Sequence, residues 1–388
     1  MSYATSLPNT DSISWTGSSR SYAISVDNDL ASIEPQWQEL ENDGNLTPFQ
    51  TRAWLLPWYR IIAPVFGIAP VFVTLRDKIS GRPLMLLLLC VRRHHGVTVI
   101  HFPDCGVSDY NAPLFAADFQ PTDEEFAVLW KDIARVLPKA DLINFEKMPE
   151  TVANRPNPMA RFVGAQRMRL SAWGFSLPKR RADYDQLLKS VVRKELRRKR
   201  RNLEVEGQIR YVRPQSAAQG REFFETLCRQ RAARYRELGR PDILGDPLFL
   251  RFYEAVIFDN WATQYGALSA LMVGEEIAAT LFALSHRDRY LLLMHCFETG
   301  RWGLKSPGIV AVDSAITDQI ESGTGYFDLT VGNESYKLQF GVKENFLYSY
   351  EQTISPLGWA YMAVRNAKRF ASEQVRKLPR KYLPENLR

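Results

Sequence analysis

Apolar positions in the first part of the chain indicate strands and helices in a fixed order. Residues 21–26 alternate like a short strand, and Leu30, Ile33, Trp37 and Leu40 follow at helical spacing. The remaining elements predicted here are a helix at 51–62, strands at 69–77, 82–93 and 96–102, a helix through 126–136, and a strand at 141–147. The predicted order is β-α-α-β-β-β-α-β.

The second part repeats this order. A short strand at 208–214 precedes two amphipathic stretches, 223–235 and 247–260. The pattern then predicts a three-stranded antiparallel meander (265–273, 277–286 and 290–297), a helix at 309–322 and a strand at 325–331. No residue-by-residue repeat accompanies the repeated order of elements.

A Pro- and Asn-rich stretch at 149–180 separates the two parts and predicts a crossover. A long basic helix is expected next, over 185–206, with Asp183 as its N-cap and Gly207 at its end. Its apolar stripe is Tyr184, Leu188, Val192, Leu196 and Leu203. The predicted organisation is a disordered N-terminus (1–20), an N-terminal domain (21–150), a crossover (151–183), a basic connecting helix (184–207), a C-terminal domain (208–355) and a basic amphipathic C-terminal helix (356–388).

Composition narrows the class of protein. The chain has 388 residues, 45% of them hydrophobic and 24% charged, which is ordinary for a globular protein of two or three domains. Its four cysteines form no CxxC pair, which favours reduced thiols in the cytoplasm and argues against a zinc site; no metal is expected. The polar N-terminus does not resemble a secretory signal, and the longest apolar run is too short to span a membrane.

The net charge of +7 is concentrated in two segments. Residues 179–201 carry eleven Lys or Arg against three Asp or Glu, and residues 364–388 carry eight against two. Charge of this kind indicates an anionic partner for those segments or a solvated helix face, and it does not describe a generally basic surface.

The order of elements, found twice, is that of the GNAT acyltransferase fold. Two such units joined by a long helix resemble the Fem-type peptidyltransferases and the related CelD-like or BioF2-like acetyltransferases. Local strings that carry the resemblance are TPFQTRAWLLPWYR (47–60), VSDYNAPLF (107–115), KELRRKRRNLEVEG (194–207) and SPGIV (306–310) followed by FDLTVGNESYKLQFG (327–341). The similarity covers residues 21–355. It implies an α/β (α+β) fold of two tandem GNAT-like domains and an acyl-transferring enzyme.

The resemblance also implies a donor site before the helix at 309–322. GNAT enzymes bind the pyrophosphate of acyl-CoA at this place with backbone N–H groups at a helix N-terminus. The usual Q/R-x-x-G-x-G/A spacing is absent here, although glycines and cations precede the helix. The expected donor-binding residues are Arg301, Gly303, Lys305, Ser306, Pro307, Gly308 and Ile309.

Four residues are candidates for catalysis. By resemblance, Lys337 would stabilise charge in the transition state, as a cation near an oxyanion does; the structural alternative is a surface lysine. Asp328 would orient Lys337 or an incoming amine, or form a buried ion pair. Tyr336 would act as general acid, or pack as an aromatic. His295 would act as general base or be a core histidine, and Glu298 is an alternative base.

Five further residues are candidates for acceptor binding. Asp109 and Tyr110 lie in a loop that, by resemblance, faces the acceptor. Arg231, Arg234 and Tyr235 could bind a phosphate or carboxylate of the acceptor, although a solvated helix face is the alternative for the arginines.

Three functions follow from these patterns. The first is an N-acyltransferase that moves an acyl group from acetyl-CoA or another acyl-CoA to an amine or hydroxyl of a sugar-nucleotide, polysaccharide or envelope precursor. The second is a Fem-type enzyme with aminoacyl-tRNA as donor. The basic helix at 189–201 favours this function, although the helix lacks aromatics for base stacking. The third is a non-catalytic scaffold in polysaccharide synthesis. The basic C-terminal stretch suits either a docking helix or peripheral contact with the inner face of a membrane.

Overall fold

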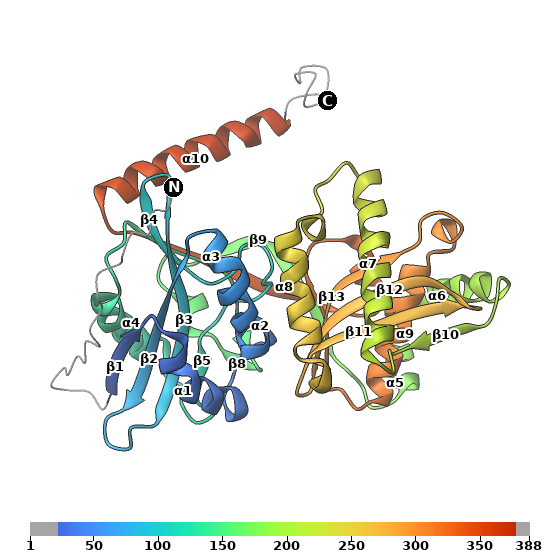
Figure 1. Cartoon of the computed structure of the whole chain (residues 1–388), viewed down its shortest axis with the longest axis horizontal. Coiled ribbons are helices and arrows are strands. Elements are labelled where there is room, and N and C mark those ends of the chain that lie inside the picture. Colours follow the sequence, from blue (N-terminus) through green and yellow to red (C-terminus); the bar gives the residue numbers. More distant parts are fainter. Residues whose placement is uncertain (1–21, 378–388) are drawn as a thin grey trace.

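The N-terminal unit follows the order predicted from the sequence. The computed structural model describes residues 22–377, so the disorder predicted for 1–20 lies outside the described part (Figure 1). The elements are β1 (Tyr22–Asp27), α1 (Leu30–Asp43), α2 (Arg52–Pro57), α3 (Ala63–Val65), β2 (Ala69–Asp77), β3 (Pro83–His94), β4 (Val97–His101), β5 (Leu114–Phe115), α4 (Asp123–Val136) and β6 (Leu142–Pro149). Helices α2 and α3 are joined by a π-helical turn, Trp58–Ile62, next to Pro57 and Pro64.

The C-terminal unit repeats that order, as predicted. Its elements are β10 (Ile209–Val212), α7 (Ala217–Glu237), α8 (Pro247–Phe258), β11 (Gly266–Val273), β12 (Glu276–His286), β13 (Arg289–Phe297), α9 (Pro307–Glu321) and β14 (Tyr326–Val331). Both turns of the meander contain a residue at positive φ, Gly274 and Arg287, which lets adjacent strands reverse direction tightly.

The two units exchange strands across the middle of a single sheet. The segment predicted as a crossover, 151–183, contains an 11-residue strand that the sequence pattern did not predict, β9 (Gln166–Ser176). β9 pairs with β14 of the C-terminal unit, whereas β15 (Lys343–Thr353), which follows the C-terminal unit, pairs with β6 of the N-terminal unit. β9 and β15 also pair with each other, so the sheet is continuous from β1 to β10.

The long basic helix is two helices. α5 (Arg181–Leu187) and α6 (Ser190–Glu204) are separated at Leu188, whose backbone is extended. Asp183 does not cap a helix, because it lies inside α5 and pairs with Arg180. The predicted apolar stripe is nevertheless confirmed, since four of its five members are buried in one core with α9: Tyr184, Leu188, Leu196 and Leu203.

The units also share a hydrophobic core. Helices α2 and α8 lie side by side where the units meet (Figure 1). The ring of Trp54 on α2 lies 5.0 Å from that of Phe252 on α8, and Thr51 Oγ1 donates to Tyr265 Oη over 3.0 Å. Separate cores lie beneath α4 in the N-terminal unit and beneath α9 in the C-terminal unit. The shared core holds the two units in one fixed arrangement.

The last helix, α10 (Pro356–Lys377), extends away from the sheet (Figure 1). Leu357, Trp359 and Val364 on its first half are exposed. The expectation of a C-terminal helix is confirmed over this range, and the rest of 356–388 lies outside the described residues. Between residues 22 and 377, none of the helices combines the length and apolarity that crossing a membrane requires.

Candidate functional site

Strands β13 and β14 separate part-way along their length. They pair in parallel from Arg289 and Tyr326 up to Leu291 and Asp328. Beyond that point β14 contains a bulge, where Thr330 has φ +57°, and the register of β13 also shifts. The Thr330 hydroxyl donates to the Leu292 carbonyl over 3.3 Å at the start of the gap. A bulge next to a gap between strands is a common way to position an active site.

The residues predicted to bind the donor gather at the start of α9, which follows β13. Gly303 and Lys305 lie in a short 3₁₀ turn (Gly303–Lys305), and Ser306, the N-cap, has φ +56°. Gly308 lies against β13, because a Cβ there would come within 2.8 Å of the Phe297 ring. The first turn of α9 contains no acidic residue. The partial positive charge of this helix end is therefore not neutralised from within the helix.

Three cations surround this helix end. Lys199, on α6, donates to Ser306 Oγ over 3.1 Å. Arg301 and Lys305 both pair with Glu206. Arg301 also pairs with Glu276, and Lys199 pairs with Glu195, so each of the three cations has a carboxylate partner. The attraction of this place for an anion therefore rests mainly on the backbone N–H groups of the helix end. The arrangement suits an anionic ligand such as a diphosphate.

His295 and Tyr336 meet beside the same helix end. Tyr336 Oη lies 3.3 Å from His295 Nδ1, and a Cβ on Gly308 would lie 3.4 Å from the His295 ring. Burial lowers the pKa of His295 to about 4, with Lys337 contributing, and burial raises the pKa of Tyr336. Both side chains are thus neutral at pH 7, and His295 Nδ1 can accept a hydrogen bond from the Tyr336 hydroxyl. Glu298 lies further along the loop, where it accepts from Gly300 N.

Lys337 is buried and bonded to backbone. Its side chain is 3% exposed, and Nζ donates to the carbonyls of Thr330, Val331 and Gly332 over 3.0–3.3 Å. It also pairs with Glu334. The surface-lysine alternative is therefore wrong. Because an ammonium has only three N–H donors, these contacts favour a role in holding the end of β14, and a direct role in charge stabilisation stays a prediction.

Asp328 is the last residue of β14 that pairs with β13, and it is hydrogen-bonded to the N-terminal unit. It is 5% exposed, and Tyr110 Oη donates to its carboxylate over 2.9 Å. Thr330 N donates to Oδ1 over 2.7 Å. Burial raises the pKa of Asp328 to about 6, against the lowering effect of these two hydrogen bonds. A carboxyl with a pKa near neutrality can exchange a proton with an acceptor.

Asp109, the neighbour of Tyr110, reaches the same place. Its carboxyl interacts with the Thr330 side chain, and burial raises its pKa although Lys147 acts in the opposite direction. The loop that carries both residues is fixed at its base, where Lys147 Nζ donates to the Ser108 carbonyl over 2.7 Å. The structure therefore brings Asp109, Tyr110 and Asp328 together across the junction of the units.

The other predicted acceptor residues lie on α7 and are occupied by neighbours. Arg231 donates to Asp242 Oδ1 over 2.6 Å and to Tyr235 Oη over 3.0 Å. Arg234 pairs with Glu237 on the surface. Their contacts are those of a structural ion pair and a solvated helix face, so acceptor binding by these three residues stays a prediction without support from the geometry.

A pocket that no sequence pattern predicted lies beside Asp328. It has a volume of about 270 Å³ and is lined by both units and by β15. Its polar lining residues include Glu150, Asn154, Arg289, Tyr326 and Asn345. Tyr326 and Asp328 could have been linked from the alternation of β14, which places them on one face. The other residues come from distant segments, some of them on or next to the exchanged strands.

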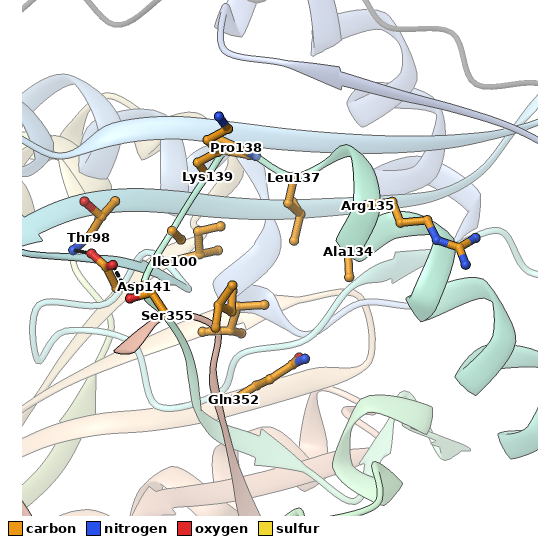
Figure 2. Close-up of a pocket in the computed structure, with 13 residues that line it drawn as sticks. Thr98, Ile100, Ala134, Arg135, Leu137, Pro138, Lys139, Asp141, Gln352 and Ser355 are labelled. Carbon is orange, nitrogen blue, oxygen red and sulfur yellow. Dashed lines mark hydrogen bonds between the residues drawn. The ribbon is translucent and has the colours of Figure 1, made fainter. Parts of the chain in front are cut away.

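A second pocket, at the outer end of β4 and β6, offers less chemistry (Figure 2). Asp141 lines this pocket, but its carboxylate already accepts hydrogen bonds from Thr98 N over 2.8 Å and from Ser355 Oγ. Those two hydrogen bonds lower the pKa of Asp141. This carboxylate therefore anchors the end of β15 and is not free to exchange protons near pH 7.

Comparison with known proteins supports the fold. A family model described as an acetyltransferase (GNAT) domain matches residues 190–338, the range from α6 to Leu338. No curated protein matches the chain in sequence. Among solved structures, FemX is similar with a TM-score of 0.56 at 8% identity, covering 81% of this chain and 95% of FemX.

Two further structures have the same fold. The C-terminal domain of a lysylphosphatidylglycerol synthetase from Agrobacterium fabrum matches with a TM-score of 0.50 at 10% identity, covering 86% of this chain and 95% of the other. L-PGS from Bacillus licheniformis matches with a TM-score of 0.50 at 12% identity, covering 87% and 97%. At such low identities these likenesses concern the fold alone. The chain thus has the two-unit α/β (α+β) fold of these structures, and residues 190–338 match the model of a GNAT acetyltransferase domain.

Proposed function

We propose that this chain is an acyl-CoA-dependent acyltransferase whose donor binds in the C-terminal unit and whose acceptor is an amine. The observation that carries the proposal is the start of α9, where the N-cap Ser306 makes no side-chain hydrogen bond to the helix, the first turn has no acidic residue, and Lys199, Arg301 and Lys305 lie nearby. It adjoins the gap between β13 and β14. Backbone N–H groups and cations at such a helix end would hold the diphosphate of the donor.

Transfer from a thioester to an amine forms a C–N bond and breaks the C–S bond. One proton leaves the nitrogen and one reaches the sulfur. In the proposed mechanism Asp328 takes the proton from the nitrogen, for which its pKa of about 6 makes it suitable. The Tyr336 hydroxyl gives a proton to the departing thiolate and recovers one from solvent, while neutral His295 orients it.

Direct attack by the amine requires no acyl-enzyme. Consistent with this, burial raises the pKa of all four cysteine thiols, Cys90, Cys105, Cys228 and Cys296. Thiols held in the neutral form at pH 7 are poor nucleophiles. The structure thus offers a proton acceptor at the gap and no activated thiol.

Calorimetry with acetyl-CoA tests the donor directly. We expect saturable binding at micromolar to millimolar concentration, and an assay of free CoA thiol with a panel of primary amines should show amine-dependent release. Absence of binding at millimolar acetyl-CoA would rule out the proposed donor. Binding without thiol release by any amine would point instead to a non-catalytic role.

One observation favours a second candidate, with aminoacyl-tRNA as donor. Lys194, Arg197 and Arg201 are spaced along one exposed face of α6. Such a row can contact a polyanion, and binding to RNA would fall steeply with salt. Protein purified at low salt with nucleic acid bound, released as salt rises, would support this donor. Clean protein that binds acetyl-CoA would count against it.

A further inference from the structure

The pocket beside Asp328 borders the gap between β13 and β14. Leu291 and Asp328, the last residues paired across these strands, both line it. Tyr326 and Arg289, the first paired residues, line it as well. The start of α9 packs on the other face of the sheet, with the core that contains Phe327 and Leu329. A ligand in this pocket would therefore reach the gap from the face opposite α9.

The charges of the lining favour a cation over an anion. Three carboxyl groups line the pocket, Glu150, Asp328 and Glu344, against a single guanidinium, Arg289. Arg167 pairs with Glu344 over 2.9 Å, which offsets one of the three. Arg289 donates to Asn154 Oδ1 over 3.0 Å and stacks on the Tyr326 ring. The remaining excess of negative charge lies at Asp328, at the inner end, and at exposed Glu150.

The rest of the lining suits a hydroxylated body of small size. Amide groups of Asn154 and Asn345 and the phenol of Tyr326 are fixed by hydrogen bonds, such as that from Asn345 Nδ2 to Tyr326 Oη over 2.9 Å. The Tyr326 and Phe346 rings add flat apolar surface. The volume, about 270 Å³, is slightly below the ~300–1,000 Å³ typical of small-molecule sites and suits a single sugar-sized molecule.

We propose that this pocket is the acceptor site and that it selects a primary amine on an uncharged, polyhydroxylated body of monosaccharide size, while it disfavours a phosphorylated acceptor. The ammonium or amine would lie at Asp328, which has hydrogen bonds from Tyr110 and Thr330 but retains acceptor capacity on Oδ2. The inference rests on the proposed acyl transfer for its chemistry, but the binding itself does not require a donor.

Two probes of equal scaffold test it, glucosamine and glucosamine 6-phosphate, with glucose as the control without an amine. Binding is measured by NMR titration of the full chain in the absence of acetyl-CoA, and KM is measured by release of CoA thiol. We expect glucosamine to bind at least fivefold more tightly than its 6-phosphate, and glucose to bind more weakly than glucosamine.

Glu150→Lys at the exposed rim should reverse this preference. Reversing one charge at the pocket rim should change the dissociation constant of each charged probe about fivefold, in opposite directions for the two amines. Glu225→Lys, on the exposed face of α7 and outside the pocket, is the matched control and should change neither. Both sites are exposed, so both variants should fold.

The outcomes separate this inference from the proposed function. Tighter binding of the 6-phosphate, absence of binding by either amine, or equal behaviour of the Glu150 and Glu225 variants overturns the pocket assignment, even where acetyl-CoA binds and is consumed with other amines. If glucosamine binds as expected but acetyl-CoA does not bind, the pocket assignment stands and the donor assignment fails.

Discussion

The two units have the same order of elements, but the starts of their equivalent helices carry opposite charge. Helix α4 begins with Asp123, Glu124 and Glu125, and Thr122 and Glu125 form a capping box. Helix α9 has no acid in its first turn, and Ser306 caps it without a side-chain hydrogen bond to the backbone. Acids at a helix start neutralise the end that would bind an anion. The start of α9 is therefore the more favourable of these two helix ends for an anion.

Each unit has a pair of parallel strands, β4 and β6 or β13 and β14, and the residues at the end of this pairing also differ between the units. In the register of the sheet, Asn144 on β6 occupies the position that Asp328 occupies on β14, since each is the last paired residue. The gap of the N-terminal unit is filled by its own loop, in which Asn111 N donates to the Lys147 carbonyl over 2.9 Å. The same loop carries Tyr110 to Asp328. The N-terminal unit thus supplies a hydrogen bond to the carboxylate at the gap of the C-terminal unit.

Replacing the carboxyl of Asp328, at the gap between β13 and β14, should have the largest effect on activity. Asp328→Asn keeps the size of the side chain but removes the proton acceptor, so we expect kcat to fall at least ~100-fold, the usual contribution of a general base. The Kd of acetyl-CoA should stay within about twofold. The matched change in the other unit, Asn144→Ala, should leave kcat per folded protein nearly unchanged. An Asp328→Asn variant with wild-type kcat would remove the proposed distinction between the units.

The pH dependence should report the same carboxyl. With a pKa of about 6, Asp328 is protonated below that value, so kcat should fall about tenfold per pH unit in the acid range and level off above pH 7. Asp328→Asn should abolish this acid limb of the residual activity. A wild-type profile that is flat from pH 5 to 8 would show that Asp328 is not the base.

The free energy of unfolding should fall as pH rises, whereas kcat should rise. Because the folded pKa of Asp328 exceeds the unfolded value, the folded state binds more protons between pH 4 and 6, and stability falls as pH rises through this window. The shift corresponds to about 2–3 kcal/mol at pH 7 if no other group compensates. Asp328→Asn should therefore lose less stability than the wild type between pH 4 and 7, as measured by urea unfolding at each pH.

An acid introduced at the start of α9 should make it resemble α4. Ser306→Asp tolerates the left-handed backbone, places a carboxylate near Lys199 and should stabilise the helix by a few tenths of a kcal/mol or more. It should also repel the donor phosphates and raise the Kd of acetyl-CoA about tenfold. Thr122→Asp, the equivalent change on α4, should not alter donor affinity. Loss of affinity together with unchanged or higher Tm separates repulsion from misfolding.

The smallest effect concerns Glu206, which pairs with Arg301 and Lys305. Glu206→Gln should free Lys305 and leave Arg301 paired with Glu276 alone, so the Kd of acetyl-CoA should fall about threefold at low ionic strength, with the difference shrinking as salt is added. Glu204→Gln, two residues earlier and paired with Arg200, is the matched control. A weaker affinity in the Glu206 variant would mean that the pair only positions the loop.

The regular elements could be predicted from sequence because local patterns determine them. Alternation and tight turns identified β11, β12 and β13, and the apolar stripe identified the buried face of α5 and α6. β9 was missed because its pairing partners, β14 and β15, lie far along the chain and because Arg167 and Arg169 give its first half a polar composition. A strand stabilised by distant partners leaves a weak local signal.

The candidate site could be predicted only in part, for the same reason. The residues at the start of α9 are contiguous, so a family resemblance located them together. The contact of Tyr110 with Asp328 joins positions 218 residues apart, and this hydrogen bond lowers the pKa of Asp328, which burial raises. Lys337 lies in a recognisable string, but only the structure shows that its ammonium binds three carbonyls.

The central claim, that only the C-terminal unit binds the donor, is tested most directly by amide hydrogen exchange with and without acetyl-CoA. Backbone amides at the start of a helix that bind phosphate exchange more slowly. The account predicts slower exchange at residues 303–312, at the start of α9, and no change at 122–130, at the start of α4. Protection at 122–130, or at neither helix start while acetyl-CoA binds, would contradict it.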